Sequence, residues 1–368
     1  MSLLQAGLSK ASYGELIRPE DPRWLGLLGK VSSDIYHRPG YLRAAAAADD
    51  GDLWIAWVVD GEIEGGVPLL LRPLPRGQGG PERRRDAASP YGYPCPLSTA
   101  ATLEEWRRFW RVLRALLSEE GILAAFFRLH PLLTESTCLE AAAEVAHLVE
   151  HGPTVHVDLT QSEETLWSHT RPRLRSNINR LRREGWRFQP NDWSLLPTFI
   201  ALYEATMMRS AASAFYFFPP SYYRALREGL GDAVTLHGVL APDGQLASAG
   251  MFFRQGALVQ YHLGGTAPDY VAAAPAKLLF HEVRLWYRQA GAGLLHLGGG
   301  LGGERDSLYR FKAGYSKDSS SFCTLRAIID PGSYQALTMA WETASGRTAP
   351  DIRDYFPAYR APIVSIHS

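Results

Sequence analysis

Residues 234–253 have the sequence VTLHGVLAPDGQLASAGMFF, two apolar runs separated by a turn at Asp243-Gly244. This pattern predicts a β-hairpin, because an Asp-Gly pair supplies the backbone angles that a tight turn requires. The same design occurs 183 residues earlier, where LWIAWVV meets Asp60-Gly61 and a second apolar run ends in VPLLL. The repeated hairpin indicates that the chain contains two copies of one design.

Helical patterns accompany both hairpins. Apolar residues recur at helical spacing over 103–120 and again over 275–290. Strands next to helices in each half favour two mixed α/β domains. We place the first domain at 1–152, ending after an alanine-rich helix over 136–151, and the second at 153–335.

Two other segments are predicted to lack regular packing. Residues 76–85, RGQGGPERRR, combine glycines, a proline and like charges, which favours a surface loop. Residues 336–368 are expected to form a poorly packed C-terminal tail, because a glycine and three prolines interrupt it, at Gly346, Pro350, Pro357 and Pro362.

The composition excludes several classes of protein. The 368 residues carry 38 basic and 38 acidic side chains, so no net charge attracts nucleic acid or an anionic membrane. Three scattered cysteines are too few for a disulfide framework or a zinc cluster and are expected to be free thiols. No apolar run is long enough to span a membrane, and the start lacks a signal-peptide core. We therefore expect a cytoplasmic protein.

The strongest local charge lies in residues 170–187, TRPRLRSNINRLRREGWR, with seven arginines and one acid. Pro172 suits the first turn of a helix and Gly185 suits its end. The positive end of that helix, together with Arg171 and Arg175, is suited to hold phosphate oxygens. The alternative is a solvated basic face without a ligand.

A second candidate anion site follows the predicted strand at 258–263. Small residues lead from that strand to a helix with Pro275 near its first turn, so backbone N–H groups around Ala274 can converge on a ligand beside Lys277. The spacing matches neither a P-loop nor a dinucleotide-binding fingerprint. Small residues before a helix also serve simply for packing.

A third candidate is the strand end at 295–303, LHLGGGLGG, which is followed by Lys312 between aromatic residues. Glycines let a ligand approach the backbone closely, and the lysine is placed to donate to an oxyanion or phosphate. A flexible linker with a surface lysine is the alternative.

Tyr91 and Tyr93 lie on a turn, where they are expected to line a substrate cleft between the halves or to pack the domain contact. Hydrolase and metal-site motifs are lacking, so no metal is expected.

Four segments in this order resemble the FemABX-like transferases, the FemAB-type acyltransferases of the GNAT superfamily. These segments span roughly residues 40 to 320 and are PLL with SPYG at 68–92, DL with the arginine-rich helix at 158–185, YHLGG with PAK at 261–277, and LGG with LYRFKAGY at 297–315. The resemblance implies two tandem GNAT-like domains of class α/β (α+β), each a mixed, mostly antiparallel sheet flanked by helices. Phe311-Lys312 matches the FK motif of these transferases. The long coiled-coil arm of some cell-wall members is missing here.

The resemblance implies transfer of an acyl or aminoacyl group to an amine, with acyl-CoA or aminoacyl-tRNA as donor and no tightly bound cofactor. In the peptidoglycan branch the acceptor is an amine on a cell-wall precursor. Lys312 is then the expected electrostatic donor, with Tyr315 or Asp306 handling the proton. The donor is assigned to Ala274, Lys277, Arg171 and Arg175, and the substrate to Tyr91, Tyr93, Tyr261, His262 and Phe311. The alternative is a non-catalytic module that binds RNA or another polyanion.

Overall fold

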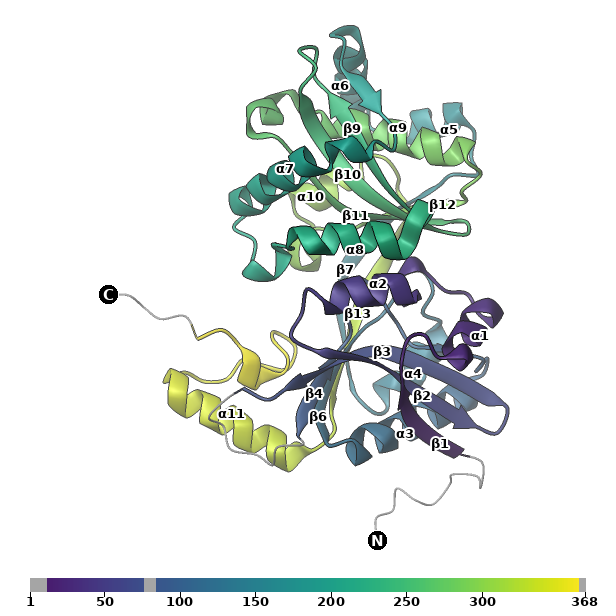
Figure 1. Ribbon diagram of the computed structural model, residues 1–368, viewed down its shortest axis with the longest axis vertical. Helices are drawn as coiled ribbons and strands as arrows, with labels where there is room; N and C mark the ends of the chain where they lie inside the picture. Colours follow the sequence, from purple (N-terminus) through teal and green to yellow (C-terminus); the bar gives the residue numbers. More distant parts are fainter. Residues whose placement is uncertain (1–11, 76–83, 364–368) are drawn as a thin grey trace. The chain divides into compact units, whose positions relative to one another are not determined.

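The computed structural model describes residues 12–75 and 84–363, and the chain forms two compact units (Figure 1). Unit 1 contains the chain up to Glu150 and again from Cys323 onward, and unit 2 runs from His151 to Phe322. The predicted loop at 76–85 lies almost entirely outside the described residues. No helix in the described parts combines the length and the apolar character needed to cross a membrane.

Unit 1 is built on a mostly antiparallel sheet, in which β4 and β6 form the one parallel pair among the described residues of the unit. Its strands lie in the order β1 (Ser12–Ile17), β2 (Asp52–Asp60), β3 (Ile63–Pro73), β4 (Arg85–Ala88), β6 (Ile122–Arg128) and β13 (Ser319–Ile328), with β5 (Leu97–Ser98) beside β3. The predicted hairpin is confirmed, since β2 and β3 pair around Gly61, whose φ is +63°.

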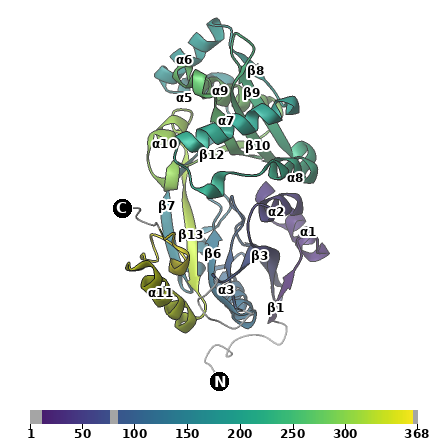
Figure 2. The ribbon, with the colours of Figure 1, turned by 60° about the vertical axis from the view of Figure 1, so that its left-hand side comes forward.

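Helices cover both faces of this sheet (Figure 2). The helices of unit 1 are α1 (Pro22–Lys30), α2 (Pro39–Ala46), α3 (Leu103–Glu119), α4 (Ser136–Ala143) and α11 (Pro331–Ser345). On one face, α3 buries the apolar stripe expected from its sequence against Leu325 and Ala327 of β13. On the other face, α11 packs against Leu123 through Leu337 and Trp341.

The C-terminal residues differ from the expected loose tail. Residues 323–368 belong to unit 1, so the assignment of 153–335 to the second domain is corrected at its end. Trp341 and Tyr359 are buried, and the Arg360 guanidinium donates to the buried Asp86 carboxylate. The prolines interrupt helices there without preventing burial, because apolar side chains between them reach the sheet.

The boundary between the units is also of a different kind from the one predicted. The alanine-rich helix ends at Ala143, and β7 (His147–Asp158) runs straight through Gly152-Pro153. Helix propensity is high in this segment, but the β-branched residues near its end pair in a ladder with β12. The first unit therefore leads into the second along a strand.

Unit 2 has a sheet in the order β7, β12 (Leu294–Gly298), β11 (Leu258–Thr266), β10 (Leu246–Gln255), β9 (Val234–Leu240) and β8 (Arg187–Gln189). The described pairs among these strands are antiparallel except β11 with β12. The second predicted hairpin, β9 with β10, is confirmed. The first residues of β13 lie beside β7, where the Thr154 hydroxyl donates to the Ser320 carbonyl at 3.0 Å.

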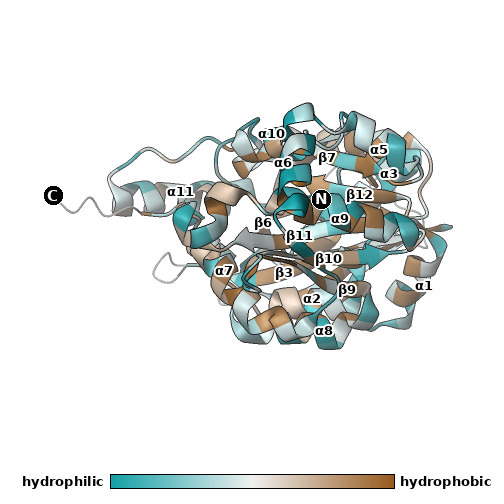
Figure 3. Ribbon diagram, turned by 90° about the horizontal axis from the view of Figure 1, so that it is seen from above, coloured by the Kyte–Doolittle hydropathy of each residue, from teal (hydrophilic) through white to brown (hydrophobic). Residues whose placement is uncertain are grey.

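The helices of unit 2 are α5 (Glu163–His169), α6 (Pro172–Arg183), α7 (Leu196–Arg209), α8 (Pro220–Leu230), α9 (Ala276–Gln289) and α10 (Ser307–Lys312). The side chains of α7 and α8 pack on one face of the sheet, and α9 packs on the other. In Figure 3 the apolar residues gather along the strands, whereas α6 is strongly hydrophilic. Pro172 and Gly185 begin and end α6 as predicted.

Candidate active site

The strands β11 and β12 separate after three residue pairs. Their parallel ladder joins Leu258 to Leu294, Val259 to Leu295 and Gln260 to His296. Beyond this point β11 stays with β10 up to Thr266, and β12 stays with β7 up to Gly298. Within the described residues the two strands form no further ladder pair, so a wedge opens between them from Tyr261 onward. We call it the β11–β12 wedge.

Lys312 lies where this wedge opens. Its Nζ donates to the Gly299 carbonyl oxygen at 2.7 Å, immediately after β12. The same nitrogen is 5.5 Å from the centre of the Tyr261 ring, on the first residue of β11 beyond the last ladder pair. Lys312 is only 5% exposed. The residue of the FK motif therefore meets both strands that bound the wedge.

The surroundings of Lys312 favour its neutral form. Burial lowers the pKa of Lys312 to about 7, and the negative charge of Asp306 offsets only part of that effect. The Asp306 carboxylate caps α10, since it accepts the backbone N–H of Tyr309 at 2.8 Å and of Leu301 at 3.1 Å. Burial raises the pKa of Asp306, but these backbone N–H groups outweigh it and hold the pKa below its ordinary value. Asp306 is thus a stable anion.

The glycines after β12 fold this loop onto itself. A Cβ at Gly300 would lie 2.1 Å from the Glu304 carbonyl oxygen and 2.3 Å from Asp306 Oδ1. Only glycine permits that approach. The loop can therefore pack against Asp306 at the α10 cap, and this packing holds the neighbouring Gly299 carbonyl next to Lys312. The sequence predicted that the glycines let another group approach the backbone closely, and at Gly300 that group is the chain itself.

Tyr315 connects α10 to the start of α9. It is 1% exposed, and its hydroxyl donates to the Lys277 carbonyl oxygen at 2.8 Å. Its ring stacks on Phe280 at 5.9 Å and meets Phe311 edge-on at 5.6 Å. Burial raises the pKa of Tyr315. The Tyr315 hydroxyl proton is thus engaged and hard to remove, and the Asp306 carboxylate is occupied by the α10 cap; that either residue handles the reaction proton stays a prediction.

Three cations gather where α9 begins. Burial lowers the pKa of Lys277, and the nearby positive charges of Arg173 and Arg180 lower it further. Arg180 donates to the Ala273 carbonyl oxygen at 2.9 Å, next to Ala274. Ala274 adopts a left-handed backbone with φ of +56° just before the helix. The positive end of α9 adds to these charges, so an anion is favoured here.

The arginines that join Lys277 differ from those predicted. Arg173 and Arg180 are seven residues apart and share one flank of α6, whereas Arg175 lies about 200° around the helix from Arg173. Arg171 instead donates to the Arg310 carbonyl oxygen at 3.0 Å and ties α6 to α10. The structure thus brings Arg173 and Arg180, rather than Arg171 and Arg175, to Lys277, and the assignment of Arg171 and Arg175 to the donor stays a prediction. The seven-residue spacing of Arg173 and Arg180 is the sequence pattern that indicates a shared helix face for these two arginines.

Tyr261 and His262 face opposite sides of β11, as consecutive strand residues do. The Tyr261 ring packs on Phe280 of α9 at 4.8 Å, on the side of Lys312. His262 lies beneath α8, where its Nε2 and the Tyr222 hydroxyl are 2.8 Å apart, and burial lowers its pKa to about 3. The structure thus places His262 on the face of β11 opposite Tyr261 and Lys312, and the assignment of both residues to the substrate stays a prediction.

Tyr91 and Tyr93 belong to unit 1. The Tyr91 carbonyl oxygen accepts the Tyr41 hydroxyl at 2.8 Å, and the Tyr93 ring meets Tyr36 and His130 edge-on, both at 5.7 Å. Both tyrosines thus pack against residues of their own unit. Their assignment to substrate stays a prediction.

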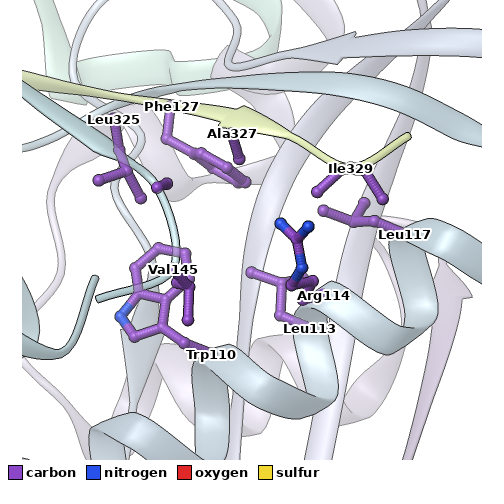
Figure 4. A pocket seen from close by; sticks show the side chains of 10 residues that line it. Trp110, Leu113, Arg114, Leu117, Phe127, Val145, Leu325, Ala327 and Ile329 are labelled. Carbon is purple, nitrogen blue, oxygen red and sulfur yellow. The ribbon is translucent and has the colours of Figure 1, made fainter. Parts of the chain in front are cut away.

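Unit 1 also contains an apolar pocket (Figure 4). Its lining is aliphatic and aromatic apart from Arg114, which donates to the Ile328 carbonyl oxygen at 3.1 Å. The cavity volume is only about 10 Å³, the space of one water molecule. We therefore place no substrate there.

Comparison with known proteins agrees with this geometry. The acetyltransferase (GNAT) domain model matches residues 168–313, which include the β11–β12 wedge, the start of α9 and Lys312. The structure of FemX is similar over 88% of this chain and 98% of its own, with a TM-score of 0.64 and 13% identity. This chain has a FemABX-like fold. The fold predicted from the four sequence segments is confirmed.

Two other solved structures extend the comparison. L-PGS from Bacillus licheniformis matches 84% of this chain and 92% of its own at a TM-score of 0.53 and 14% identity. A tandem GNAT protein from the clavulanic acid biosynthesis pathway matches 87% and 99% at a TM-score of 0.50 and 13% identity. Two tandem GNAT-like domains therefore describe the architecture. No curated protein sequence gives a significant match.

Proposed function

We propose that the protein transfers an acyl or aminoacyl group from an activated donor to an amine. The observation that carries this proposal is the β11–β12 wedge with Lys312 at its opening. Amine attack on an ester or thioester carbonyl asks for orientation, a route for one proton and a donor to the developing oxyanion. The reaction needs no nucleophilic side chain, which fits a wedge whose described neighbours are the Lys312 amine, the Tyr261 ring and the Gly299 carbonyl.

The donor is proposed to lie along β11. The backbone edge of β11 from Leu263 to Thr266 faces the wedge without a ladder partner among the described residues, so an extended donor arm can bond to it as an added strand does. The phosphates of the donor then reach the cations at the start of α9, namely Lys277, Arg173 and Arg180. Both acyl-CoA and aminoacyl-tRNA carry phosphates, and neither is proposed to be retained as a tightly bound cofactor.

The acceptor is proposed to be a small amine or an amine on a cell-wall precursor, approaching the same carbonyl near Lys312. An ammonium at Lys312 would stabilise the oxyanion, while Asp306 and Tyr315 hold the loop and α10 in place. Tyr261 and Phe311 supply aromatic surface beside it. A cytoplasmic location, expected from the few cysteines, stays a prediction.

The donor site is tested by paired substitutions on α6. Arg173→Ala with Arg180→Ala should weaken binding of the productive donor at least tenfold and reduce the dependence of binding on salt, because two phosphate contacts are lost. The matched control is Arg175→Ala with Arg183→Ala on the rest of the helix. Binding of CoA, acetyl-CoA, longer acyl-CoAs and aminoacyl-tRNA is measured by calorimetry or filter binding, and transfer to a panel of amines is followed in parallel. Equal weakening by both pairs would contradict the assignment.

A second candidate function is that of a non-catalytic module for RNA or another polyanion. It is favoured by the arginines of α6, of which Arg173 and Arg183 are exposed and Arg175 is half-buried. Ion pairs hold Arg180 and Arg182, whereas no ion pair holds the other three within the described residues. This function predicts that both α6 variants lose affinity for RNA alike and that no donor is consumed. Turnover with any amine would exclude it.

A further inference from the structure

Lysine is rare in this chain. The sequence contains 38 lysines and arginines, of which five are lysine: Lys10, Lys30, Lys277, Lys312 and Lys317. Arginine keeps its charge at every working pH, whereas a buried lysine amine readily loses its proton. Most basic residues of this chain are arginine, but the one at the opening of the wedge is a lysine. An arginine there would supply a permanent charge, whereas the lysine amine can titrate.

The contacts of Lys312 include no counter-ion. Lys312 is 5% exposed as a residue, and its amine forms no ion pair with an acid in the described residues. Among the residues that the structure describes, the acceptor of its hydrogen bond is the Gly299 carbonyl oxygen, at 2.7 Å. Asp306 is the acid that acts on it electrostatically, and the oxygens of Asp306 are occupied by the α10 cap.

The other titratable groups around Lys312 are the phenols of Tyr261 on β11 and Tyr315 after α10. Burial raises the pKa of both phenols, so both are neutral near pH 7. The guanidinium of Arg284 lies 5.5 Å from the centre of the Tyr315 ring and adds a positive charge, not a negative one. None of these described groups therefore places a negative charge in contact with the Lys312 amine.

We propose that Lys312 is the proton acceptor that turns the acceptor ammonium into a nucleophile. This role rests on the proposed function. It differs from that of a permanently charged lysine, because Lys312 starts neutral and becomes charged during the reaction. It follows from an uncompensated amine held by one carbonyl at the opening of the wedge. The positive charge then arises beside the carbonyl at the moment when the oxyanion forms.

The proton and electron balance is as follows. The acceptor R–NH₃⁺ gives one proton to neutral Lys312, and the freed nitrogen lone pair forms a C–N bond to the donor carbonyl carbon as the C=O π pair moves to oxygen. When the C=O bond re-forms, the bond from that carbon to the donor sulfur or oxygen breaks and the leaving group takes the electron pair. The leaving group takes the second nitrogen proton, which gives the amide and a neutral thiol or alcohol. Lys312 returns its proton to solvent.

The first test measures the protonation of Lys312 directly. The full chain is labelled with lysine carrying ¹³C at the ε carbon, which gives signals from only five residues, and each is followed by NMR from pH 5 to 11. We expect the Lys312 signal to titrate near pH 7, well below the range of an ordinary lysine, and to vanish in Lys312→Arg. Lys317→Arg, an exposed control, should remove a different signal. A Lys312 midpoint near the ordinary value for lysine overturns the proton-acceptor role and leaves the proposed function standing.

The second test uses transfer itself. With a productive donor, kcat/KM of the wild type should rise with pH to a plateau through the midpoint found by NMR. Lys312→Arg and Lys312→Met should both lose about 10²–10⁴-fold in kcat and lose that limb of the profile, because neither accepts a proton. Retention of most of the rate in Lys312→Arg alone would show a charge role and overturn the inference. A midpoint near 7 without transfer to any amine would overturn the proposed function instead.

Discussion

Replacing Lys312 by methionine should make the protein more stable at neutral and acidic pH. Methionine keeps an unbranched apolar chain of similar length, so the packing against Tyr261 is preserved while the buried amine is removed. The folded-state pKa of Lys312 is about 7, against 10.5 for an ordinary lysine. At about 1.4 kcal/mol per unit, the buried ammonium costs about 5 kcal/mol. Leaving the Gly299 carbonyl without its donor costs about 1–3 kcal/mol, so the variant should gain about 3 kcal/mol.

The sign of this gain depends on pH. Below about pH 7 the amine is protonated in both the folded and the unfolded chain, and the wild type carries the full penalty. Between pH 7 and 10.5 the unfolded chain still binds the proton while the folded chain has released it, so the wild type gains stability as the pH rises. The advantage of Lys312→Met is expected to disappear at about pH 9, where the remaining penalty of the wild type equals the cost of the lost hydrogen bond, and above that pH the variant is the less stable protein.

The assay is urea unfolding of both proteins at pH 6, 8 and 9.5, followed by circular dichroism. Other groups with shifted pKa values are common to both proteins and cancel in the difference. Lys317→Met, at an exposed position, serves as the control and should change the free energy of unfolding by less than about 0.5 kcal/mol. A difference between wild type and Lys312→Met that stays constant with pH would refute the reasoning, since it would mean that the folded protein keeps Lys312 protonated throughout.

Three further outcomes test the roles assigned to individual residues. Trp341→Ala should lower the free energy of unfolding by about 3–5 kcal/mol in urea titrations, because Trp341 is buried between α11 and the sheet; a loose tail would give almost no change. Asp34→Ala should cost about 3 kcal/mol by the same measurement, since it removes the cap at residue 35 and leaves the Nε2–H of His130 without its carboxylate, 3.0 Å away; an unchanged urea midpoint would speak against this buried pair. Asp306→Asn keeps the cap of α10 but removes the negative charge that favours protonated Lys312, so the Lys312 midpoint in the NMR titration should fall still lower; a rise would contradict the assigned electrostatics.

Local patterns in the sequence were sufficient for several elements. The two Asp-Gly hairpins, the apolar stripe of α3 and the limits of α6 all follow from residues within a few positions of one another. Turn geometry, capping and helical periodicity act over such short distances. The FK motif likewise identified Lys312, because a short motif is contained in one stretch of chain.

Contacts between distant segments decided the rest. The β11–β12 wedge exists because β12 pairs with β7 on one side while β11 pairs with β10 on the other, and no local pattern shows where those ladders part. The same holds for the burial of the C-terminal residues against β6 and for the continuation of the chain as β7 where alanines favoured a helix.

The site shows the division most clearly. From the sequence alone, Arg171, Arg175 and His262 were as suitable as Arg173, Arg180 and Tyr261, because each has the right chemistry. Helix and strand periodicity sort them by face, but only the packing of α6 and α9 on the sheet determines which face meets the site. Residue types in the sequence determined which chemical groups this protein has available. The long-range pairing of strands decided which of these groups lie together, because the burial and the charges around Lys312 come from segments that are far apart in the chain.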